Sequence, residues 1–69
     1  MRSVGYDQVN QVLEVEFQSG AIYQYLDVSL AIYKEFLDAE SKGQYFSSAI
    51  RDIYEFVRVE QPARGATAH

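Results

Sequence analysis

The first half of the chain alternates between hydrophobic and polar residues, a pattern typical of strands that bury one face. The clearest case is VLEVEF (Val12–Phe17), in which three hydrophobic residues share one face and two glutamates the other. A shorter strand is predicted over residues 3–7. Ser19-Gly20 predicts a tight two-residue loop, because glycine adopts positive φ without strain. The strand that returns from this loop is expected over residues 21–26.

A two-residue loop determines how these two strands pair, and therefore which face each side chain occupies. It places Glu14 opposite Tyr25 and Glu16 opposite Tyr23. Both tyrosine rings then point away from the hydrophobic interior, each beside a glutamate. The hydrophobic face predicted by this register consists of Leu13, Val15, Phe17, Ile22 and Leu26.

From residue 29 the hydrophobic positions recur every three to four residues, which indicates helices. Ser29 is a suitable N-cap for a long amphipathic helix that runs to about Glu40, and Gly43 is a natural residue to follow its end. Phe36 lies on the hydrophobic side of this helix and is expected to cover the sheet. A second, short helix is predicted over Tyr45–Ile53.

These patterns predict a small α+β domain with an antiparallel sheet of three to four strands, one face of which packs against both helices. The fourth strand would be the segment EFVRV, residues 55–59. The domain is expected to span residues 1–59, and the small, polar residues 60–69 are expected to form a flexible tail. A chain of 69 residues allows one domain, and its core is too small to lose a large side chain easily.

Composition restricts the candidate functions. The formal net charge is −4, so a general basic surface for nucleic acid is absent. The chain has no cysteine, which excludes disulfides and thiolate metal sites and is compatible with the cytoplasm. No hydrophobic run approaches the roughly 20 residues of a membrane helix, and we expect no signal peptide, because Met1-Arg2 leads directly into a strand-like stretch. We therefore expect a cytoplasmic protein without membrane contact.

The residues that usually perform catalysis are not combined into an active-site pattern. His69 is the only histidine and lies in the predicted tail, so no serine has a neighbouring base to activate it. Neither a glycine-rich phosphate loop nor a metal-binding spacing of histidines and cysteines is present. We expect no enzyme activity, no metal, no cofactor and no small-molecule substrate.

Four segments occur in a familiar order and spacing: Val4–Asp7, Leu13–Tyr25, Ile32–Phe46 and Ile50-Arg51. Together they resemble the KTSC domain, a module named for its place at the carboxyl end of some lysyl-tRNA synthetases, which also occurs alone in bacteria and phages. The central mark of the resemblance is Tyr23-Gln24-Tyr25, and Gly43 and Phe46 match its structural positions. Ser29 and Ser47 depart from it, because proline and asparagine often occupy these places.

The resemblance implies a small binding module, and its association with a synthetase implies RNA as the partner. Tyr23 and Tyr25 would then be a stacking platform, on which one base contributes roughly 1–3 kcal/mol. The adjacent glutamates favour a protein partner instead, whose arginine stacks on a ring and pairs with a carboxylate. Such a module would be an adaptor, or a phage or bacterial modulator of a host protein. A purely structural role, in which the rings only stabilise the sheet, also stays open.

Arg51 and Arg58 are the candidate basic contacts near the second helix, although each would otherwise be solvated or paired with Asp52 or Glu55. The binding surface predicted from the sequence consists of Tyr23, Tyr25, Glu14, Glu16, Tyr45 and Arg51. The sequence leaves the oligomeric state open.

Overall fold

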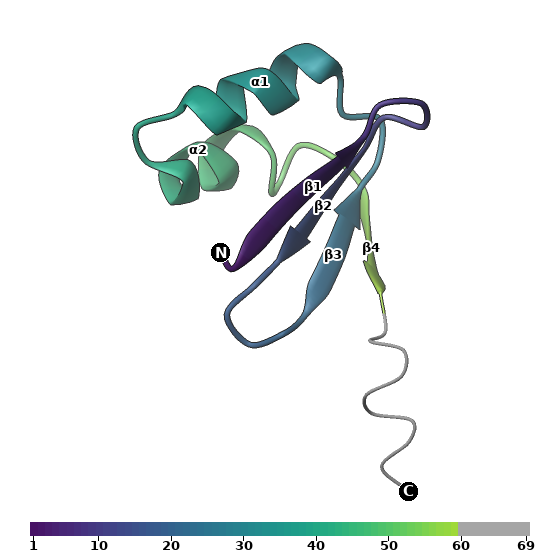
Figure 1. Ribbon diagram of the computed structural model, residues 1–69, viewed down its shortest axis with the longest axis vertical. Coiled ribbons are helices and arrows are strands. Elements are labelled where there is room, and N and C mark those ends of the chain that lie inside the picture. Colours follow the sequence, from purple (N-terminus) through teal and green to yellow (C-terminus); the bar gives the residue numbers. More distant parts are fainter. Residues whose placement is uncertain (60–69) are drawn as a thin grey trace, which may run out of the picture.

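The computed structural model describes residues 1–59 and shows an α+β fold with four strands and two helices (Figure 1). The predicted tail over residues 60–69 lies outside the described residues. The elements are, in chain order, β1 (Ser3–Asp7), β2 (Val12–Glu16), β3 (Ile22–Tyr25), α1 (Leu30–Asp38), α2 (Lys42–Ala49) and β4 (Phe56–Val59).

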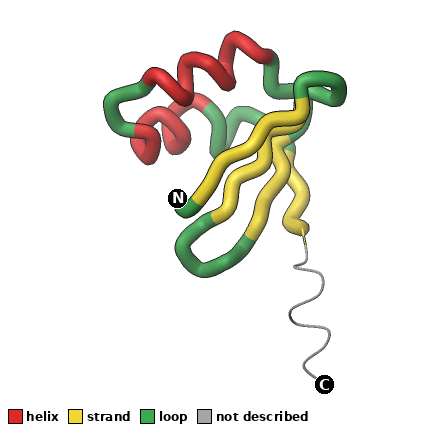
Figure 2. Tube along the Cα trace, viewed as in Figure 1, coloured by secondary structure: helices red, strands yellow, loops and turns green. Residues whose placement is uncertain are grey.

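The strands lie in the sheet in chain order, β1-β2-β3-β4, and each neighbouring pair is antiparallel. Figure 2 shows the two helices gathered at one end of the sheet, while the end with the β2–β3 loop extends beyond them. The fourth strand predicted from the sequence is therefore present. Because it pairs with β3, the central part of the sheet is formed by β2 and β3.

The pairing of β2 with β3 differs from the sequence prediction by one residue. Leu13 lies opposite Tyr25, and Val15 lies opposite Tyr23. A slip of one residue moves every side chain of a strand to the other face. The prediction that the two tyrosines point away from the core is therefore wrong, and they share the helix-facing side with Leu13 and Val15. Ile22, which was predicted to be in the core, lies on the opposite face.

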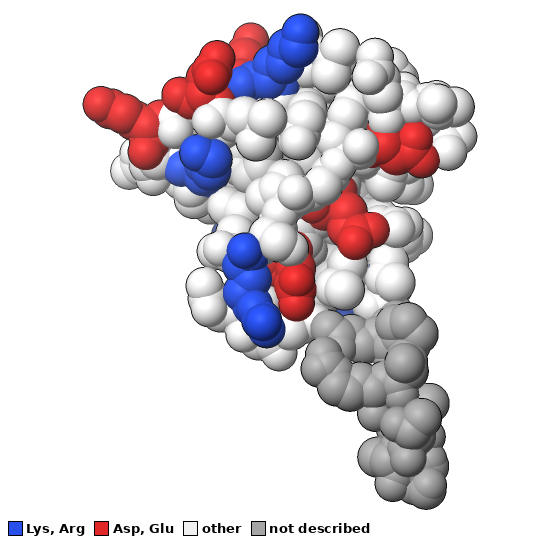
Figure 3. Space-filling model, viewed as in Figure 1, with Lys and Arg blue, Asp and Glu red and all other residues white. Residues whose placement is uncertain are grey.

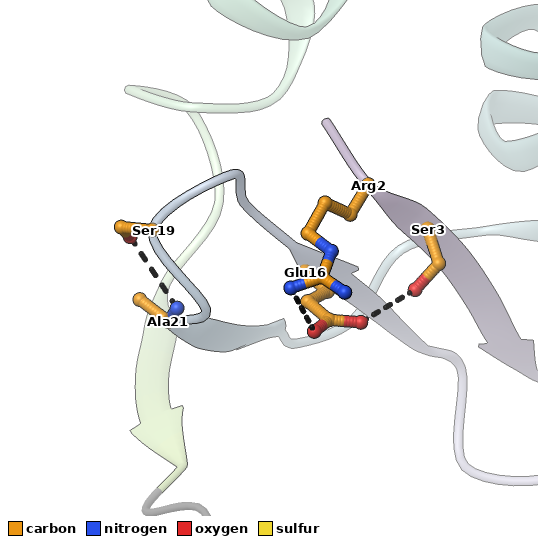
Figure 4. Close-up of polar contacts among 5 residues, drawn as sticks. All are labelled: Arg2, Ser3, Glu16, Ser19 and Ala21. Carbon is orange, nitrogen blue, oxygen red and sulfur yellow. Dashed lines mark hydrogen bonds and ion pairs between the residues drawn. The ribbon is translucent and has the colours of Figure 1, made fainter.

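The cause is a loop of three residues in place of two. The amide of Phe17 donates to the carbonyl of Ala21, and the amide of Gly20 donates to the carbonyl of Phe17, each at 2.9 Å. Gly20 has φ 95°, in the left-handed region. This is the turn in which a glycine forms a bulge after a type I turn. Figure 4 shows this loop, where the hydroxyl of Ser19 accepts a bond from the amide of Ala21 at 3.4 Å.

The outer face of the sheet, away from the helices, carries the two glutamates that were expected beside the tyrosines. Glu16 accepts a hydrogen bond from the hydroxyl of Ser3 at 3.0 Å and forms an ion pair with Arg2 at 3.7 Å (Figure 4). Glu14 accepts a bond from the side-chain amide of Gln24 at 3.0 Å. These polar pairs suit a sheet face that remains open to water.

Both helices begin at a serine N-cap, and the first helix ends before the cap of the second. Ser29 accepts a hydrogen bond from the amide of Ile32 at 3.3 Å, as its predicted role requires. Helix α1 ends at Asp38, earlier than predicted. Ser41 then caps α2 by accepting from the amide of Gln44 at 3.3 Å. Gly43 consequently lies inside α2 and does not terminate α1.

The core forms between the sheet and the helices. Phe36 of α1 is fully buried, whereas the neighbouring Leu37 is 42% exposed. The ring of Tyr6 on β1 stacks on that of Tyr33 on α1, with centroids 4.6 Å apart, and its hydroxyl donates to the carbonyl of Val28. The buried core residues are Leu13, Val15, Tyr25, Val28, Phe36, Phe46 and Ile50.

The register can be tested by a disulfide, because the chain contains no cysteine. Glu14 and Gln24 are direct partners on the outer face, so a Glu14→Cys/Gln24→Cys variant should oxidise to an intramolecular disulfide. A Glu16→Cys/Gln24→Cys control places the thiols on a diagonal of about 7–8 Å and should remain reduced. Mass spectrometry after thiol labelling measures both. Faster closure of the control pair would contradict this register.

Phe36→Ala should lower the free energy of unfolding by about 3–5 kcal/mol, because it removes a fully buried ring from a small core. That loss is comparable to the whole stability of such a domain. Leu37→Ala, at the next and more exposed position, is the matched control and should cost far less. Thermal melts followed by circular dichroism compare the two. Equal melting temperatures for the two variants would argue against the position of Phe36.

The turn between β1 and β2 makes a pH-dependent contribution to stability. The side chain and the amide of Asn10 donate hydrogen bonds to the Asp7 carboxylate and hold its pKa below the usual value. The stability from this depressed pKa is complete above the unfolded pKa and is lost as the pH falls through the folded pKa. Asp7→Asn keeps an Asx-type acceptor but does not titrate.

The wild type should therefore melt at a higher temperature than Asp7→Asn at neutral pH, and the difference should shrink in acid. Melts across that pH range provide the measurement. A difference that stays constant with pH would show that the charge of Asp7 does not stabilise the turn.

Candidate functional site

The helix-facing side of the sheet contains a pocket of about 640 Å³, near the end with the β2–β3 loop. This volume is within the range of about 300–1,000 Å³ that is usual for ligand sites. We call it the aromatic pocket, because five rings line it together with several polar side chains. The rings are Phe17, Tyr23, Tyr25, Phe46 and Phe56, and the polar side chains include Ser47, Arg51 and Asp52.

The five rings form one continuous cluster. Phe56 packs against Tyr23 and Tyr25, with centroids 5.2 and 5.4 Å away. Phe46 of α2 meets the rings of Tyr25 and Phe17 edge to face, at 5.3 and 5.7 Å. Each ring is thus held by at least two others, and such contacts favour defined relative orientations. The wall of the pocket is built before any ligand arrives.

Strand pairing explains why these rings meet. Residues directly opposite one another in an antiparallel pair point to the same side of the sheet. Tyr25 has Leu13 on one side and Phe56 on the other, and Tyr23 has Arg58 as its partner on β4. Arg58 therefore emerges on the same face as the rings, although it is not part of the pocket wall. On this face Tyr25 is buried, whereas Tyr23 is partly exposed.

Tyr25 is the deepest polar residue of the pocket. Its side chain is only 3% exposed, yet its hydroxyl makes no hydrogen bond within residues 1–59. No buried polar side-chain atom in this part of the chain lacks a partner, so the hydroxyl is the portion that reaches the open space of the pocket. Burial raises the pKa of Tyr25, as does neighbouring Tyr23, while Arg51 opposes this shift. The hydroxyl is neutral near pH 7 and available to a ligand.

Arg51 and Asp52 supply opposite charges at the polar end of the pocket. They lie in the turn after α2, where the amide of Arg51 donates to the carbonyl of Phe46 at 2.9 Å. Both are exposed, and neither side chain is in an ion pair or hydrogen bond among the described residues. Both charges act on the hydroxyl of Tyr25, Arg51 lowering its pKa and Asp52 raising it.

The structure brings three of the six predicted site residues together: Tyr23, Tyr25 and Arg51. Glu14 and Glu16 lie on the other face of the sheet because of the register. Tyr45 is absent from the pocket wall.

Tyr45 instead faces the first helix. Its ring packs on Phe36 at 6.0 Å, and its hydroxyl donates to Glu35 at 2.9 Å. Burial and this bond raise the pKa of Tyr45. These two contacts connect α2 to α1.

Sequence reasoning missed several members of the pocket. Phe17 and Phe46 were assigned to the core alone, and Phe56, Ser47 and Asp52 were not proposed as site residues. A signal for Phe56 was available, because the alternation in FVRV places it on one face with Arg58. This signal places Phe56 beside the tyrosines only in the correct register of the neighbouring strand, and the sequence prediction had that register wrong by one residue.

Within residues 1–59, no group of three or more histidine, cysteine or acidic side chains is placed to hold a metal ion. The same part of the chain contains no helix with the length and apolar character needed to cross a membrane.

The KTSC domain model matches residues 1–54 of this chain. The chain belongs to the KTSC domain family. The resemblance noted from the sequence is thus confirmed. A crystal structure of a KTSC domain protein from Yersinia pestis superposes with a TM-score of 0.81 at 34% identity, covering 84% of this chain and 82% of that one.

Two further relatives show the contexts in which the domain occurs. An uncharacterized protein from Stutzerimonas stutzeri is 39% identical over 61 residues, which are 87% of this chain and 86% of that protein. A lysine–tRNA ligase from Nostoc sp. is 38% identical over 56 residues, which are 81% of this chain and 10% of the ligase. The KTSC domain thus matches small proteins along most of their length, and a small part of much larger ligases.

Proposed function

We propose that this KTSC domain is a non-enzymatic binding module that holds single-stranded RNA at the aromatic pocket. The observation that carries the proposal is the hydroxyl of Tyr25, which belongs to a buried ring but opens, without a partner among the described residues, into a pocket walled by aromatic side chains. Because this hydroxyl reaches solvent in the pocket, it is free to exchange water for a ligand group. A base that stacks on the rings would bring such a group within its reach.

The exposed side of two of the rings is suited to stacking of a nucleic-acid base. Phe56 is 49% exposed, and Tyr23 is partly exposed beside it. Their centroids are only 5.2 Å apart, so a base fits onto them and not between them. One base on such a platform contributes roughly 1–3 kcal/mol. This geometry favours recognition of one or two unpaired nucleotides.

The corrected register removes an objection to RNA. The register predicted from the sequence had placed Glu14 and Glu16 beside the rings, where they would repel phosphates. They lie on the outer face, and Tyr23 has Arg58 as its direct neighbour. Arg58 is therefore the side chain best placed to contact a phosphate of a nucleotide stacked at Tyr23.

The electrostatic contribution should be modest. On the face seen in Figure 3, basic side chains are scattered and interleaved with acidic ones, without a continuous basic surface. The net charge of −4 agrees with this distribution. We therefore expect short-range recognition of a few nucleotides. The similarity to a segment of a lysine–tRNA ligase supports RNA as the polymer.

Asp52 supports a second candidate. A carboxylate beside exposed rings also suits an arginine of a protein partner, which would stack on a ring and pair with the carboxylate. In that case the domain is an adaptor or a modulator of another protein. The continuous wall of rings and the position of Arg58 favour RNA over this alternative.

Titration of the ¹⁵N-labelled domain with a short single-stranded RNA should shift the signals of Tyr23, Tyr25 and Phe56. Phe56→Ala should weaken binding by about 5- to 150-fold, which corresponds to one lost stacking contact. Val57→Ala is the matched control, because Val57 is the next residue, similarly exposed at 47%, and points to the outer face. RNA that leaves the pocket signals unmoved, or equal losses in both variants, would contradict the proposal.

Salt dependence tests whether Arg58 contacts a phosphate of the RNA. For single strands the logarithm of the binding constant falls with the logarithm of salt concentration by about 0.7 per phosphate contacted. Arg58→Gln should reduce this slope by about that amount and leave stacking unchanged. A slope that is the same in wild type and variant would remove Arg58 from the interface.

A further inference from the structure

The aromatic pocket combines hydrogen-bonding groups that have no partners within residues 1–59. Tyr25 and Ser47 offer hydroxyls, Arg51 is a donor only, and Asp52 is an acceptor only. Among the polar residues of the pocket wall, Tyr25 is the one that is more than nine-tenths buried. The pocket wall therefore includes both a cation and a carboxylate, together with a platform of rings.

The four common bases differ in how they would meet a carboxylate. The Watson–Crick edge of guanine has two adjacent N–H donors, at N1 and N2, followed by the O6 acceptor. Adenine presents one donor beside one acceptor, cytosine one donor beside two acceptors, and uracil one N–H between two carbonyls. A carboxylate accepts two parallel bonds from adjacent donors, and it repels the lone pairs of the other edges.

We infer that the aromatic pocket selects guanine, with Asp52 accepting from N1–H and N2–H and Arg51 donating to O6. The inference rests on the proposed function, since it names the base that the RNA site prefers. Arg51 and Asp52 are consecutive residues and both line the pocket, so one donor and one acceptor are available to a base that enters it.

Selectivity of this kind should be large for so small a site. A paired set of hydrogen bonds to one base edge discriminates against the wrong base by about 5- to 150-fold. The wrong base leaves the carboxylate of Asp52 facing an acceptor, and a site built to bond a donor rejects ligands that lack it. Arg58 contributes to every sequence alike, because it is placed for a phosphate.

The test measures binding of short oligouridylates that carry one guanine, one inosine or one adenine. The chain contains six tyrosines and no tryptophan, so quenching of tyrosine fluorescence reports stacking at the pocket. The guanine oligomer should bind best, the inosine oligomer, which lacks the N2 amine, less well, and the adenine oligomer least. The expected ratio between the first and last is about 5- to 150-fold.

Asp52→Asn separates recognition from simple electrostatics. Removal of a negative charge should strengthen binding of every RNA if Asp52 acts only through charge. If Asp52 reads the base edge, the variant should lose the preference for guanine over adenine. Glu55→Gln is the matched control, because it removes a nearby negative charge from a residue outside the pocket wall, and it should keep the preference.

Each outcome has one interpretation. Preferential binding of guanine that Asp52→Asn abolishes and Glu55→Gln preserves supports the inference. Equal binding of the three oligomers, with pocket signals shifted, overturns guanine selection but leaves RNA binding intact. Absence of binding by any oligomer overturns both proposals. Retained guanine preference in Asp52→Asn also overturns the role of Asp52.

Discussion

The left-handed conformation of Gly20 is the constraint on which the rest of the structure depends. With φ 95°, this residue closes a three-residue loop and sets β2 against β3 so that Tyr23 and Tyr25 face the helices. A residue with a Cβ adopts this conformation only at a cost. The loop precedes both helices in the chain, and it decides which side chains they cover. The core, the pocket and the polarity of the outer face all follow from it.

One set of rings forms both part of the core and the proposed binding surface. Tyr25 and Phe46 are buried core residues, and the same rings continue through Tyr23 to the exposed Phe56. A domain of this size has little surface that it can spare for a separate site. Extending the core to the surface gives a rigid platform without additional structure, because the buried rings hold the exposed ones. Substitutions at the inner rings should therefore affect folding and binding together, whereas those at Phe56 should affect mainly binding.

Local signals in the sequence predicted the elements well, and the relation between elements less well. Ser29 caps α1 as expected, and the strand over residues 3–7 has its predicted bounds. The register failed because Ser19-Gly20 is compatible with two loop lengths that differ in one residue, and alternation alone does not choose between them. Ser41 was not recognised as a second cap, so α1 was predicted too long and Gly43 was assigned to its end.

The error in the predicted register also determined which site residues were identified from the sequence. Tyr23, Tyr25 and Arg51 were identified by resemblance and by residue type, which do not depend on register. The glutamates were added because of the shifted pairing and lie on the other face. Asp52 had no pattern of its own, because it joins the pocket wall through a turn that brings it beside rings from distant strands. The periodicity of a sequence does not show which distant residues come together in the fold.

The acidic composition does not conflict with an RNA site of this size. Exposed charges influence one another strongly only within a Debye length, about 8 Å at physiological salt. Glu14 and Glu16 are on the far side of the sheet from the rings and are engaged by Gln24, Ser3 and Arg2. In the proposed RNA site, the charge that a stacked nucleotide would meet is therefore set locally by Arg51, Asp52 and Arg58. Net charge restricts binding of long polymers along a broad surface, but a pocket for one base depends on the few side chains at its rim.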